Sequence, residues 1–518
     1  MRHSRRQMHQ REESERDKNL QMQKRKAKKE QPERRKQNSR QAGRGEEKEN
    51  KKGNAQILAL TYCMVAVFLG MAGYLGYFMA VKSDKVINNP YNKRQEVLAK
   101  KVQRGEIRSK DGKVLAKTKT DSTGKDTRIY PYDEIFAPVV GRISNSMTGI
   151  EKQQCYPLLT SHVNPLRQLT NTLKGEKNPG DSVLTTLDAK LQTIAYQALG
   201  NHKGAVVAIE PSTGKVLAMV SKPSYDPNTV AKNWSSLIKD SNDDSKLVNR
   251  ATQGLYPPGS TFKVLTAMEY MIENPQTYRD FNYRCKGTDT VAGHVIHCYD
   301  NERHGILSLK NALAESCNGA FATLGTELDL DRFHKLAEKF GYNKALDADF
   351  EYNQSKFVLN KHSDNGELTQ TAIGQGKTLV TPLQNALIAA TIANDGKMML
   401  PYVVDHVESD SGQVVKSYDP KEKGQVVDEW VAQKMNDMMK SVVTSGTGYS
   451  LKSFSYEVAG KTGSAEADSE GTTHSWFIGY APADNPKIAI SVVVEGAGTG
   501  SRYAVPVTKK MLQCYLGD

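Results

Sequence analysis

The stretch Tyr256-Pro-Pro-Gly-Ser-Thr-Phe-Lys-Val-Leu-Thr-Ala267 brings a hydroxyl and an amine together. Its prolines and glycine oppose a regular helix before Ser260, and the apolar run that follows predicts a buried helix beginning at Ser260. Ser260 and Lys263 are three residues apart, so they share one face of that helix. A serine at a helix N-terminus has free backbone N–H groups nearby, and a buried lysine loses basicity. The pair is therefore a candidate for nucleophilic catalysis.

The pattern Ser-x-x-Lys alone is weak evidence, because it occurs four times, at Ser122, Ser212, Ser236 and Ser260. The first two lie in Ser-Thr-Gly-Lys turns and the third in a polar stretch. Only Ser260 follows Pro-Pro-Gly and precedes an apolar helix. The alternative for Ser260 is a helix-capping serine beside a solvated lysine.

Two more signatures follow in the chain. Ser316-Cys-Asn318 is expected to begin or lie within an apolar helix, and Lys461-Thr-Gly463 to lie on a strand. Ser-x-x-Lys, Ser-x-Asn and Lys-Thr-Gly in this order are typical of penicillin-interacting serine enzymes. Ser363-Asp-Asn365 is a second literal Ser-x-Asn, but it lies in a polar loop. We favour Ser316, because its helix can enter a core cleft.

The chain of 518 residues with 38% hydrophobic content can bury a large core, and its length suggests two or three domains. The net charge of +13 is concentrated in residues 1–56, which hold 19 Lys and Arg against 9 Asp and Glu. With almost no aliphatic residues, this basic tail is predicted to be disordered. A nucleic-acid-binding arm is the alternative function for it.

An apolar segment after the tail argues against nucleic acid as the partner. Residues 57–81 contain no charge and are long enough to cross a bilayer as a helix. The segment is too long for the apolar region of a cleavable signal peptide. Positive charge before the span predicts a cytoplasmic tail and an extracytoplasmic remainder.

The six cysteines do not define a disulfide framework. Outside the cytoplasm, Cys285 and Cys298 could close a short loop as a disulfide. Three histidines nearby, His294, His297 and His304, make zinc conceivable, but the spacing matches no usual metal pattern. We therefore expect no metal site and no cofactor, and we propose the disulfide with two free thiols as its alternative.

Four parts of the chain are predicted: a tail (1–56), a transmembrane helix (57–81), a small β-rich domain (82–170) and a larger domain (171–518). The small domain should contain a hairpin turning at Asp111-Gly112, and a strand over residues 136–141. The larger one has strands at both ends with helices between them. This order predicts an α/β (α+β) fold with a mostly antiparallel sheet flanked by helices.

From about Arg104 to the C-terminus the chain resembles the class B penicillin-binding proteins, membrane-anchored peptidoglycan D,D-transpeptidases. Besides the three motifs, the resemblance rests on Asn249-Arg-Ala251, Ile373-Gly-Gln-Gly376, Thr381-Pro-Leu-Gln384, Ala393-Asn-Asp-Gly396 and Trp476-Phe-Ile-Gly-Tyr480. The segments around Arg104 and Gly149-Ile-Glu151 are similar to the family's pedestal, or dimerisation-like, domain. A penicillin-binding protein/β-lactamase-like transpeptidase domain is implied for residues 171–518.

The resemblance implies a role for each motif residue. Ser260 would attack a D-Ala-D-Ala stem peptide or a penicillin and form an acyl-enzyme, Lys263 would accept the hydroxyl proton, and Ser316 would relay it. The substrate would be held by Asn318, Lys461, Thr462, Gly463 and Ser464. Backbone N–H groups of Ser260 and Ser464 would form the oxyanion hole.

The resemblance also implies partners and alternatives. The segment between the span and the second domain is too short for a glycosyltransferase domain. A separate membrane glycan polymerase of the shape, elongation, division and sporulation class is therefore expected. A β-lactam-sensing receptor and a D,D-carboxypeptidase are the alternative functions on this scaffold. Glu351 and Glu367 lack the Glu-x-x-x-Asn context of class A β-lactamases, which predicts a long-lived penicillin ester.

Overall fold

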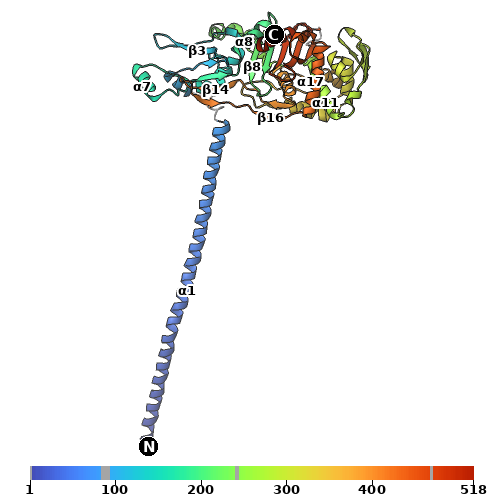
Figure 1. The fold of residues 1–518 in the computed structure, drawn as a ribbon. Helices are drawn as coiled ribbons and strands as arrows, with labels where there is room; N and C mark the ends of the chain where they lie inside the picture. The colour runs from blue at the N-terminus through green and yellow to red at the C-terminus, as the bar shows by residue number, and fades with distance from the viewer. Residues whose placement is uncertain (1–2, 83–93, 240–243, 467–470, 518) are drawn as a thin grey trace. The chain divides into compact units, whose positions relative to one another are not determined.

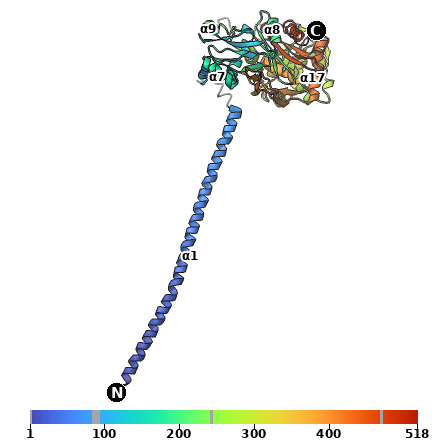
Figure 2. The same cartoon turned by 60° about the vertical axis from the view of Figure 1, so that its left-hand side comes forward.

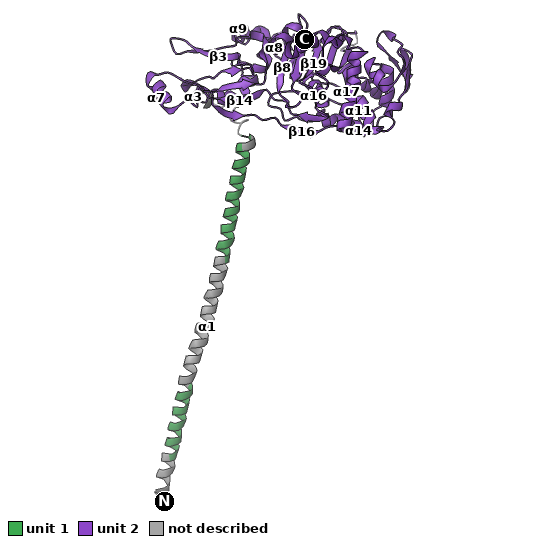
Figure 3. Ribbon diagram, in the orientation of Figure 1, with its two compact units in different colours: residues 1–86 green, residues 87–518 purple. Residues whose placement is uncertain are grey.

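The computed structural model describes residues 3–82, 94–239, 244–466 and 471–517. It divides the chain into two compact units, residues 1–86 and residues 87–518 (Figure 3). The first unit contains α1 (His3–Tyr77) and η1 (Phe78–Lys82). Within α1, Ala55–Tyr77 is long and apolar enough to cross a membrane. This span begins and ends within a few residues of the one predicted from the sequence.

The predicted disorder of residues 1–56 is not what the structure shows, because α1 runs through this tail without a break after residue 3. The described tail side chains, at residues 11–26 and 55–56, are all exposed, so no packing supports these parts of the helix. Gln, Lys, Arg and Glu dominate the tail and are strong helix formers. Their intrinsic propensity accounts for a helix where the lack of apolar residues alone suggested disorder.

The second unit begins with a six-stranded sheet in the order β15-β14-β6-β2-β3-β4. The predicted hairpin is confirmed, because β2 and β3 are antiparallel around the Asp111-Gly112 turn. The sheet strands are β2 (Ile107–Arg108), β3 (Val114–Thr120), β4 (Asp126–Ile129), β6 (Ser182–Thr185), β14 (Val404–Glu408) and β15 (Val414–Ser417). Strands β14 and β15 come from far along the chain, so this sheet crosses the predicted boundary at residue 170.

The strand predicted over residues 136–141 is wrong. These residues form the short helix α4 (Ala137–Val140), with a proline in its first turn. Proline is compatible with a helix start but donates no hydrogen bond to a strand ladder. The other helices of this region are α3 (Arg94–Lys101), α5 (Gly149–Gln153), α6 (Cys155–Leu158) and α7 (Pro165–Lys174).

A buried ion cluster holds this region together. The Glu151 carboxylate, fully buried on α5, accepts from Arg104 Nε at 2.6 Å and from Arg128 Nε at 2.7 Å. Burial alone would raise the pKa of the Glu151 carboxyl, but the two guanidiniums outweigh it and hold the pKa below its usual value. Arg104 and Glu151 are the residues that the sequence resemblance assigned to the pedestal.

A five-stranded antiparallel sheet in the order β17-β18-β19-β7-β8 forms the centre of the larger domain. Its strands are β7 (Gly204–Ile209), β8 (Val216–Lys222), β17 (Ala459–Glu466), β18 (Thr473–Ala481) and β19 (Ile488–Val494). The hairpin of β7 and β8 and the last three strands therefore share one antiparallel sheet, which agrees with the predicted antiparallel sheet built from strands at both ends of the domain. All seven residues of β19 are buried, so both faces of the sheet are covered.

Helices cover each face of this sheet. Successive residues such as Val206 and Val207 face opposite sides and belong to different apolar clusters. The cluster of Val206 includes residues of α8 and α18, and that of Val207 includes residues of α11, α16 and α17. α7 and α17 lie towards opposite ends of the unit (Figures 1 and 2). The helices of this part are α8 (Ala189–Ala198), α9 (Val230–Ile238), α10 (Arg250–Gln253), α11 (Lys263–Glu273), α12 (Leu309–Ala314), α13 (Asn318–Glu327), α14 (Leu330–Phe340), α15 (Asn365–Ala372), α16 (Pro382–Ala393), α17 (Glu429–Thr444) and α18 (Ala504–Leu516).

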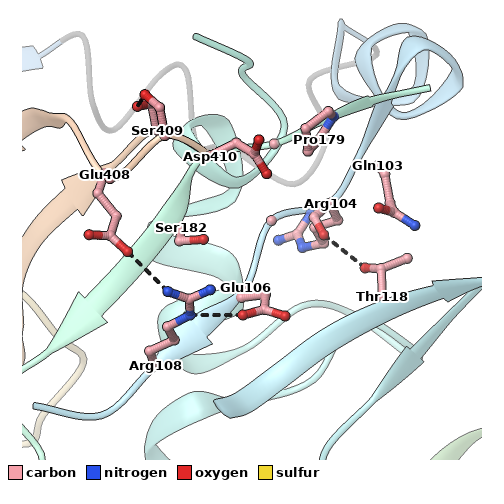
Figure 4. Close-up of a pocket in the computed structure, with 14 residues that line it drawn as sticks. Gln103, Arg104, Glu106, Arg108, Thr118, Pro179, Ser182, Glu408, Ser409 and Asp410 are labelled. Carbon is pink, nitrogen blue, oxygen red and sulfur yellow. Dashed lines mark hydrogen bonds and ion pairs between the residues drawn. The ribbon is translucent and has the colours of Figure 1, made fainter. Parts of the chain in front are cut away.

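A polar cavity of about 380 Å³ lies in the first sheet region, lined by segments around residues 103–108, 179–182 and 408–412. Figure 4 shows Arg108 between two carboxylates, with Nε 2.8 Å from Glu106 and Nη1 3.2 Å from Glu408. On the other side of the cavity, the Thr118 hydroxyl donates to the Arg104 carbonyl oxygen at 2.9 Å. None of the residues predicted to act on a substrate lines this cavity.

Candidate active site

Ser260 lies in η3 (Gly259–Phe262), a 3-10 turn that continues directly into α11. The helical segment therefore begins within one residue of the predicted start. Gly259 has a φ of +55°, and a Cβ there would lie 2.5 Å from the Ser464 carbonyl oxygen. Only glycine allows this approach, which brings the Ser260 turn against β17.

Lys263 is fully buried at the start of α11. Its Nζ donates to the Ser316 carbonyl oxygen and to Asn318 Oδ1, both at 2.6 Å, and lies 3.4 Å from Ser316 Oγ. Burial lowers the pKa of the Lys263 amine to about 8, against a smaller opposing effect of nearby thiols. A substantial share of this amine is therefore neutral near pH 8 and able to accept a proton.

Ser316 lies in the turn between α12 and α13, with Asn318 as the first residue of α13. This refines the expectation that the motif begins or lies within a helix. Ser316 has a φ of +56°, which is uncommon for a residue with a side chain. The turn directs both its Oγ and its carbonyl oxygen to the lysines.

Lys461, also fully buried, approaches the same serine from β17. Its Nζ donates to Ser316 Oγ at 2.9 Å and to the Thr462 carbonyl oxygen at 2.8 Å. Burial, and then the charge of Lys263, hold the pKa of Lys461 well below its ordinary value. The repulsion between the two amines is mutual, so each amine disfavours the charged form of the other.

The other predicted residues of β17 line the same region. A Cβ at Gly463 would lie 3.0 Å from Thr261 Cγ2, so the strand passes close to η3. Ser464 follows and is half-buried. In the described sheet β17 is an edge strand that pairs with β18 alone, so its other side can accept an extended peptide.

The Ser260 hydroxyl makes no hydrogen bond to any of the described residues, in contrast to Lys263 and Ser316. It is half-buried, and it precedes Lys263 by less than one helical turn. Catalytic hydrogen bonds are often long before a substrate binds. The structure thus brings Lys263, Ser316, Asn318 and Lys461 into direct contact and leaves the Ser260 hydroxyl unengaged.

The competing Ser363-Asp-Asn365 motif makes none of these contacts with the lysines. Ser363 Oγ accepts from the backbone N–H of Asn360, and Asp364 caps α15 through the N–H of Glu367. These contacts are local to the loop. Of the two glutamates considered for water activation, Glu351 pairs with Lys152 and Glu367 with Lys377.

Two neighbours of the site were not singled out from the sequence. The Thr447 hydroxyl hydrogen-bonds with the Thr462 hydroxyl. The His297 carbonyl oxygen accepts from Asn318 Nδ2 at 2.8 Å. Thr447 stands between two glycines, Gly446 and Gly448, which is the sequence signal that could have found it. A backbone carbonyl carries no signal of this kind.

The cysteine prediction differs from the structure. Cys285 and Cys298 are free thiols whose Sγ atoms are 3.7 Å apart, far from the roughly 2.05 Å of a disulfide. Cys298 Sγ lies at the same distance, 3.7 Å, from Cys317 Sγ. A third thiol therefore competes for the same sulfur, which the spacing of the first two could not reveal.

Comparison with known proteins assigns the family. Residues 204–513 match the penicillin binding protein transpeptidase domain, and residues 104–183 match the penicillin binding protein A dimerisation domain. The chain is 34% identical to the peptidoglycan D,D-transpeptidase PbpA of Mycolicibacterium smegmatis, over 84% of this chain and 94% of that protein. It is 32% identical to the peptidoglycan D,D-transpeptidase MrdA of Acinetobacter baumannii, over 74% of this chain and 65% of that one.

A solved structure shares the fold. The penicillin G acyl-enzyme complex of penicillin-binding protein A from M. tuberculosis is 32% identical, covers 80% of this chain and 99% of its own, and superposes with a TM-score of 0.72. An acyl-enzyme is also the species that the Ser260 region was predicted to form. With its transpeptidase domain, its match to a dimerisation domain and its apolar N-terminal helix, the chain belongs to the class B penicillin-binding proteins.

Proposed function

We propose that Ser260 carries the ester through which this chain cross-links peptidoglycan as a D,D-transpeptidase. The assignment of these residues rests on one observation, which is that Lys263, Ser316 and Lys461 converge at one place. Two buried amines from different elements meet one serine hydroxyl beside the η3 turn. This arrangement can remove a proton from a nucleophile and deliver it to a leaving group.

The first half of the reaction forms the ester. Ser260 Oγ attacks the carbonyl carbon of the penultimate D-Ala, and neutral Lys263 takes the hydroxyl proton. Ser316 passes that proton to the nitrogen of the terminal D-Ala as the C–N bond breaks. The backbone N–H groups of Ser260 and Ser464 would stabilise the oxyanion.

The second half transfers the acyl group. An amine of a neighbouring stem peptide attacks the ester carbon, the bond to Ser260 Oγ breaks, and the amine proton returns to the serine. Asn318 and the open edge of β17 would hold the donor peptide, with Lys461, Thr462 and Ser464 near its carboxylate. Gly463 would let the peptide backbone approach the strand.

The low pKa of Lys461 suggests how the carboxylate is recognised. Without a ligand, burial and Lys263 disfavour the charged amine. A carboxylate placed beside it would favour the ammonium form. We infer that substrate binding is accompanied by proton uptake at Lys461, which strengthens the ion pair inside a site with little water.

A penicillin would enter the same reaction as a substitute for acyl-D-Ala-D-Ala. Its lactam C–N bond breaks and the nitrogen remains attached to the same molecule, so no leaving group departs. The ester on Ser260 would then persist, because neither Glu351 nor Glu367 stands in the Glu-x-x-x-Asn context of a water-activating base. In the structure these two glutamates pair with Lys152 and Lys377.

The membrane orientation of the chain, its partner in the cell and its domain boundaries are also proposals. Basic residues precede the apolar helix Ala55–Tyr77, which favours a cytoplasmic N-terminus and an extracytoplasmic catalytic domain. The glycan strands would come from a separate membrane polymerase of the shape, elongation, division and sporulation class. The four parts of the chain proposed from the sequence, with boundaries at residues 56, 81 and 170, are kept, although β14 and β15 return to the pedestal sheet.

This function is tested by identifying the products that the chain forms from a synthetic donor peptide. The full chain in detergent is incubated with an acyl-D-Ala-D-Ala peptide and an amine acceptor, and the products are separated by mass. Release of D-Ala with transfer to the amine is expected from a transpeptidase. Hydrolysis alone would indicate a carboxypeptidase, and neither product together with stable penicillin binding would indicate a receptor.

A further inference from the structure

An amphipathic helix on the surface of the second unit turns its apolar face away from the protein. In α7, Leu166, Leu169 and Leu173 are 75%, 58% and 80% exposed, and no residue of the helix is buried. The three leucines are three and four positions apart, so they form one face. A surface helix of a globular protein normally turns such a face to the core. An apolar face that points outwards instead marks a binding surface.

The polar face of α7 is the one that contacts the rest of the unit. Asn171 lies two positions from each of the last two leucines, which is about 200° around the helix. Its Nδ2 donates to Asn178 Oδ1 at 3.0 Å. Arg167, one turn earlier, forms an ion pair with Asp410 in the turn between β14 and β15. The leucines therefore point outwards because the opposite side of the helix is bound.

Both ends of α7 are capped, so the helix does not depend on burial of its leucines. Asn164 Oδ1 accepts from the N–H of Leu166 at 2.9 Å, and Pro165 occupies the first helical position. Gly175, with a φ of +70°, follows the last residue. These are ordinary start and stop signals of a helix. Substitutions on the leucine face should therefore leave the helix in place.

We propose that α7 docks on the surface of the membrane that the apolar helix Ala55–Tyr77 crosses, with its three leucines inserted among the lipid headgroups. Leucines on one face and basic residues beside them are the pattern of helices that lie in a membrane interface. Docking would give the chain a second attachment to the membrane besides the span. The proposal needs the span but does not rest on the proposed catalytic function.

The connectivity of the chain favours the membrane as the occupant. α3 begins twelve residues after Lys82, so the connecting chain can extend at most about 40 Å. β1 (Val102–Gln103) follows α3 directly and pairs in parallel with β5 (Asn178–Pro179). Asn178 of β5 is the residue that Asn171 of α7 contacts. α3 and α7 lie at the same end of this unit (Figure 3), which is the end tethered to the span.

The charges near the leucine face complement anionic lipid headgroups. Residues 94–101 and 165–177 each hold three basic residues and one acidic residue, which gives each segment a net charge of +2. Lys100, Lys101 and Lys174 are exposed, and no ion pair joins them to a residue that the structure describes. Basic segments beside a membrane span are attracted to anionic lipids. We therefore expect stronger docking on an anionic membrane than on a zwitterionic one.

The depth of a fluorescent probe on α7 tests the docking. Cys63 and Cys514, the two cysteines that are not buried, are first replaced by serine. The full chain is labelled at Leu169→Cys with an environment-sensitive dye and reconstituted in phosphatidylcholine vesicles with and without phosphatidylglycerol. Nitroxide-labelled lipids should quench this dye, and more strongly when phosphatidylglycerol is present. The same dye at Ile306→Cys, an exposed position elsewhere in the unit, should be quenched several-fold less.

Two substitutions that add the same charge separate leucine insertion from electrostatic attraction. With the dye at Leu173→Cys, Leu169→Asp should lower the ratio of docked to free helices by about tenfold or more, because the burial of one leucine is lost. Gln168→Asp adds a negative charge at the neighbouring position, off the leucine face, and should retain most of the quenching. Equal losses from the two substitutions would overturn the insertion of the leucines.

Three further results would overturn the proposal. The dye at position 169 could be quenched no more than the dye at position 306, which would place the leucines in water. Its emission could shift to the blue without lipid quenching and in proportion to the number of chains per vesicle, which would assign the leucine face to a second copy. A shift seen only after other membrane proteins of the host are added to the vesicles would assign it to a protein partner.

Discussion

Ser316 Oγ accepts a hydrogen bond from Lys461 Nζ at 2.9 Å, although the two residues are 145 positions apart in the chain. Lys263 Nζ lies 3.4 Å from the same hydroxyl. The serine is therefore the meeting point of the two buried amines. A hydroxyl that contacts both amines can accept a proton from one group while it donates its own proton to another. The proposed reaction needs such a proton relay.

Ser316→Ala should lower the rate of acylation by about 10²-fold or more, the usual cost of losing a proton-transfer group. The measurement is the second-order rate constant for labelling by a fluorescent penicillin. Ser363→Ala is the matched control, because Ser363 stands in the competing Ser-x-Asn and its side chain bonds only to nearby residues, Asn360 and Glu367. A larger loss from the Ser363 change than from the Ser316 change would move the motif to the loop.

Acylation should become faster as the pH rises and reach a plateau above about pH 8. The reason is that Lys263 accepts a proton only as the neutral amine, and burial lowers its pKa to about 8. Below that pH the ammonium form predominates and the rate falls about tenfold per pH unit. Labelling rates between pH 6 and 9 check this. A rate that does not change with pH would show that Lys263 is not the base.

Glu151→Gln should destabilise the pedestal region by roughly 3–5 kcal/mol, because Arg104 and Arg128 would keep their charges in a buried place without a counter-ion. The midpoint of denaturant unfolding of the whole chain is measured. Glu351→Gln, which removes an exposed pair with Lys152, is the control and should change little.

The same cluster predicts how stability responds to acid. The folded-state pKa of Glu151 lies below its ordinary value, so its stabilising effect is present above that value and is lost as the pH falls through the folded pKa. The wild type should therefore lose more stability on acidification than Glu151→Gln does. Equal acid sensitivity of the two proteins would contradict the role of this ion cluster.

Protease added to protoplasts should digest the catalytic domain and spare the N-terminal tail. The expectation follows from the excess of positive charge before the span Ala55–Tyr77. Antibodies against each end identify the surviving fragment, and permeabilised protoplasts are the control in which the tail is digested too. Survival of the catalytic domain in sealed protoplasts would reverse the orientation.

Much of the central fold follows from local patterns. The strands around Val207 and Val493 are apolar on both faces, and Asp188 and Thr381 cap α8 and α16 through their side chains. These features are determined by residues that are close together in the sequence. For the same reason Lys263, Ser316 and Lys461 could be selected before their contacts were known, since each stands in a short motif within an apolar context.

Other features depend on partners that are distant in sequence. β14 and β15 join the pedestal sheet although more than two hundred residues separate β14 from its partner β6, and no local sequence pattern indicates this pairing. The positive φ of Ser316 results from how α12 and α13 meet. Cys317 stands inside the Ser-x-Asn motif and no sequence pattern pairs it with Cys298, although its sulfur lies 3.7 Å from that of Cys298. In each case tertiary packing decides the conformation or the neighbour.

The most direct test of the central claim is the mass of the purified chain after brief exposure to benzylpenicillin. We expect one added penicillin per chain, located on Ser260 by fragmentation, which persists after free antibiotic is removed and is absent from Ser260→Ala and Lys263→Ala. An unmodified chain with rapid release of hydrolysed penicillin, or a stable adduct on a different serine, would contradict the account.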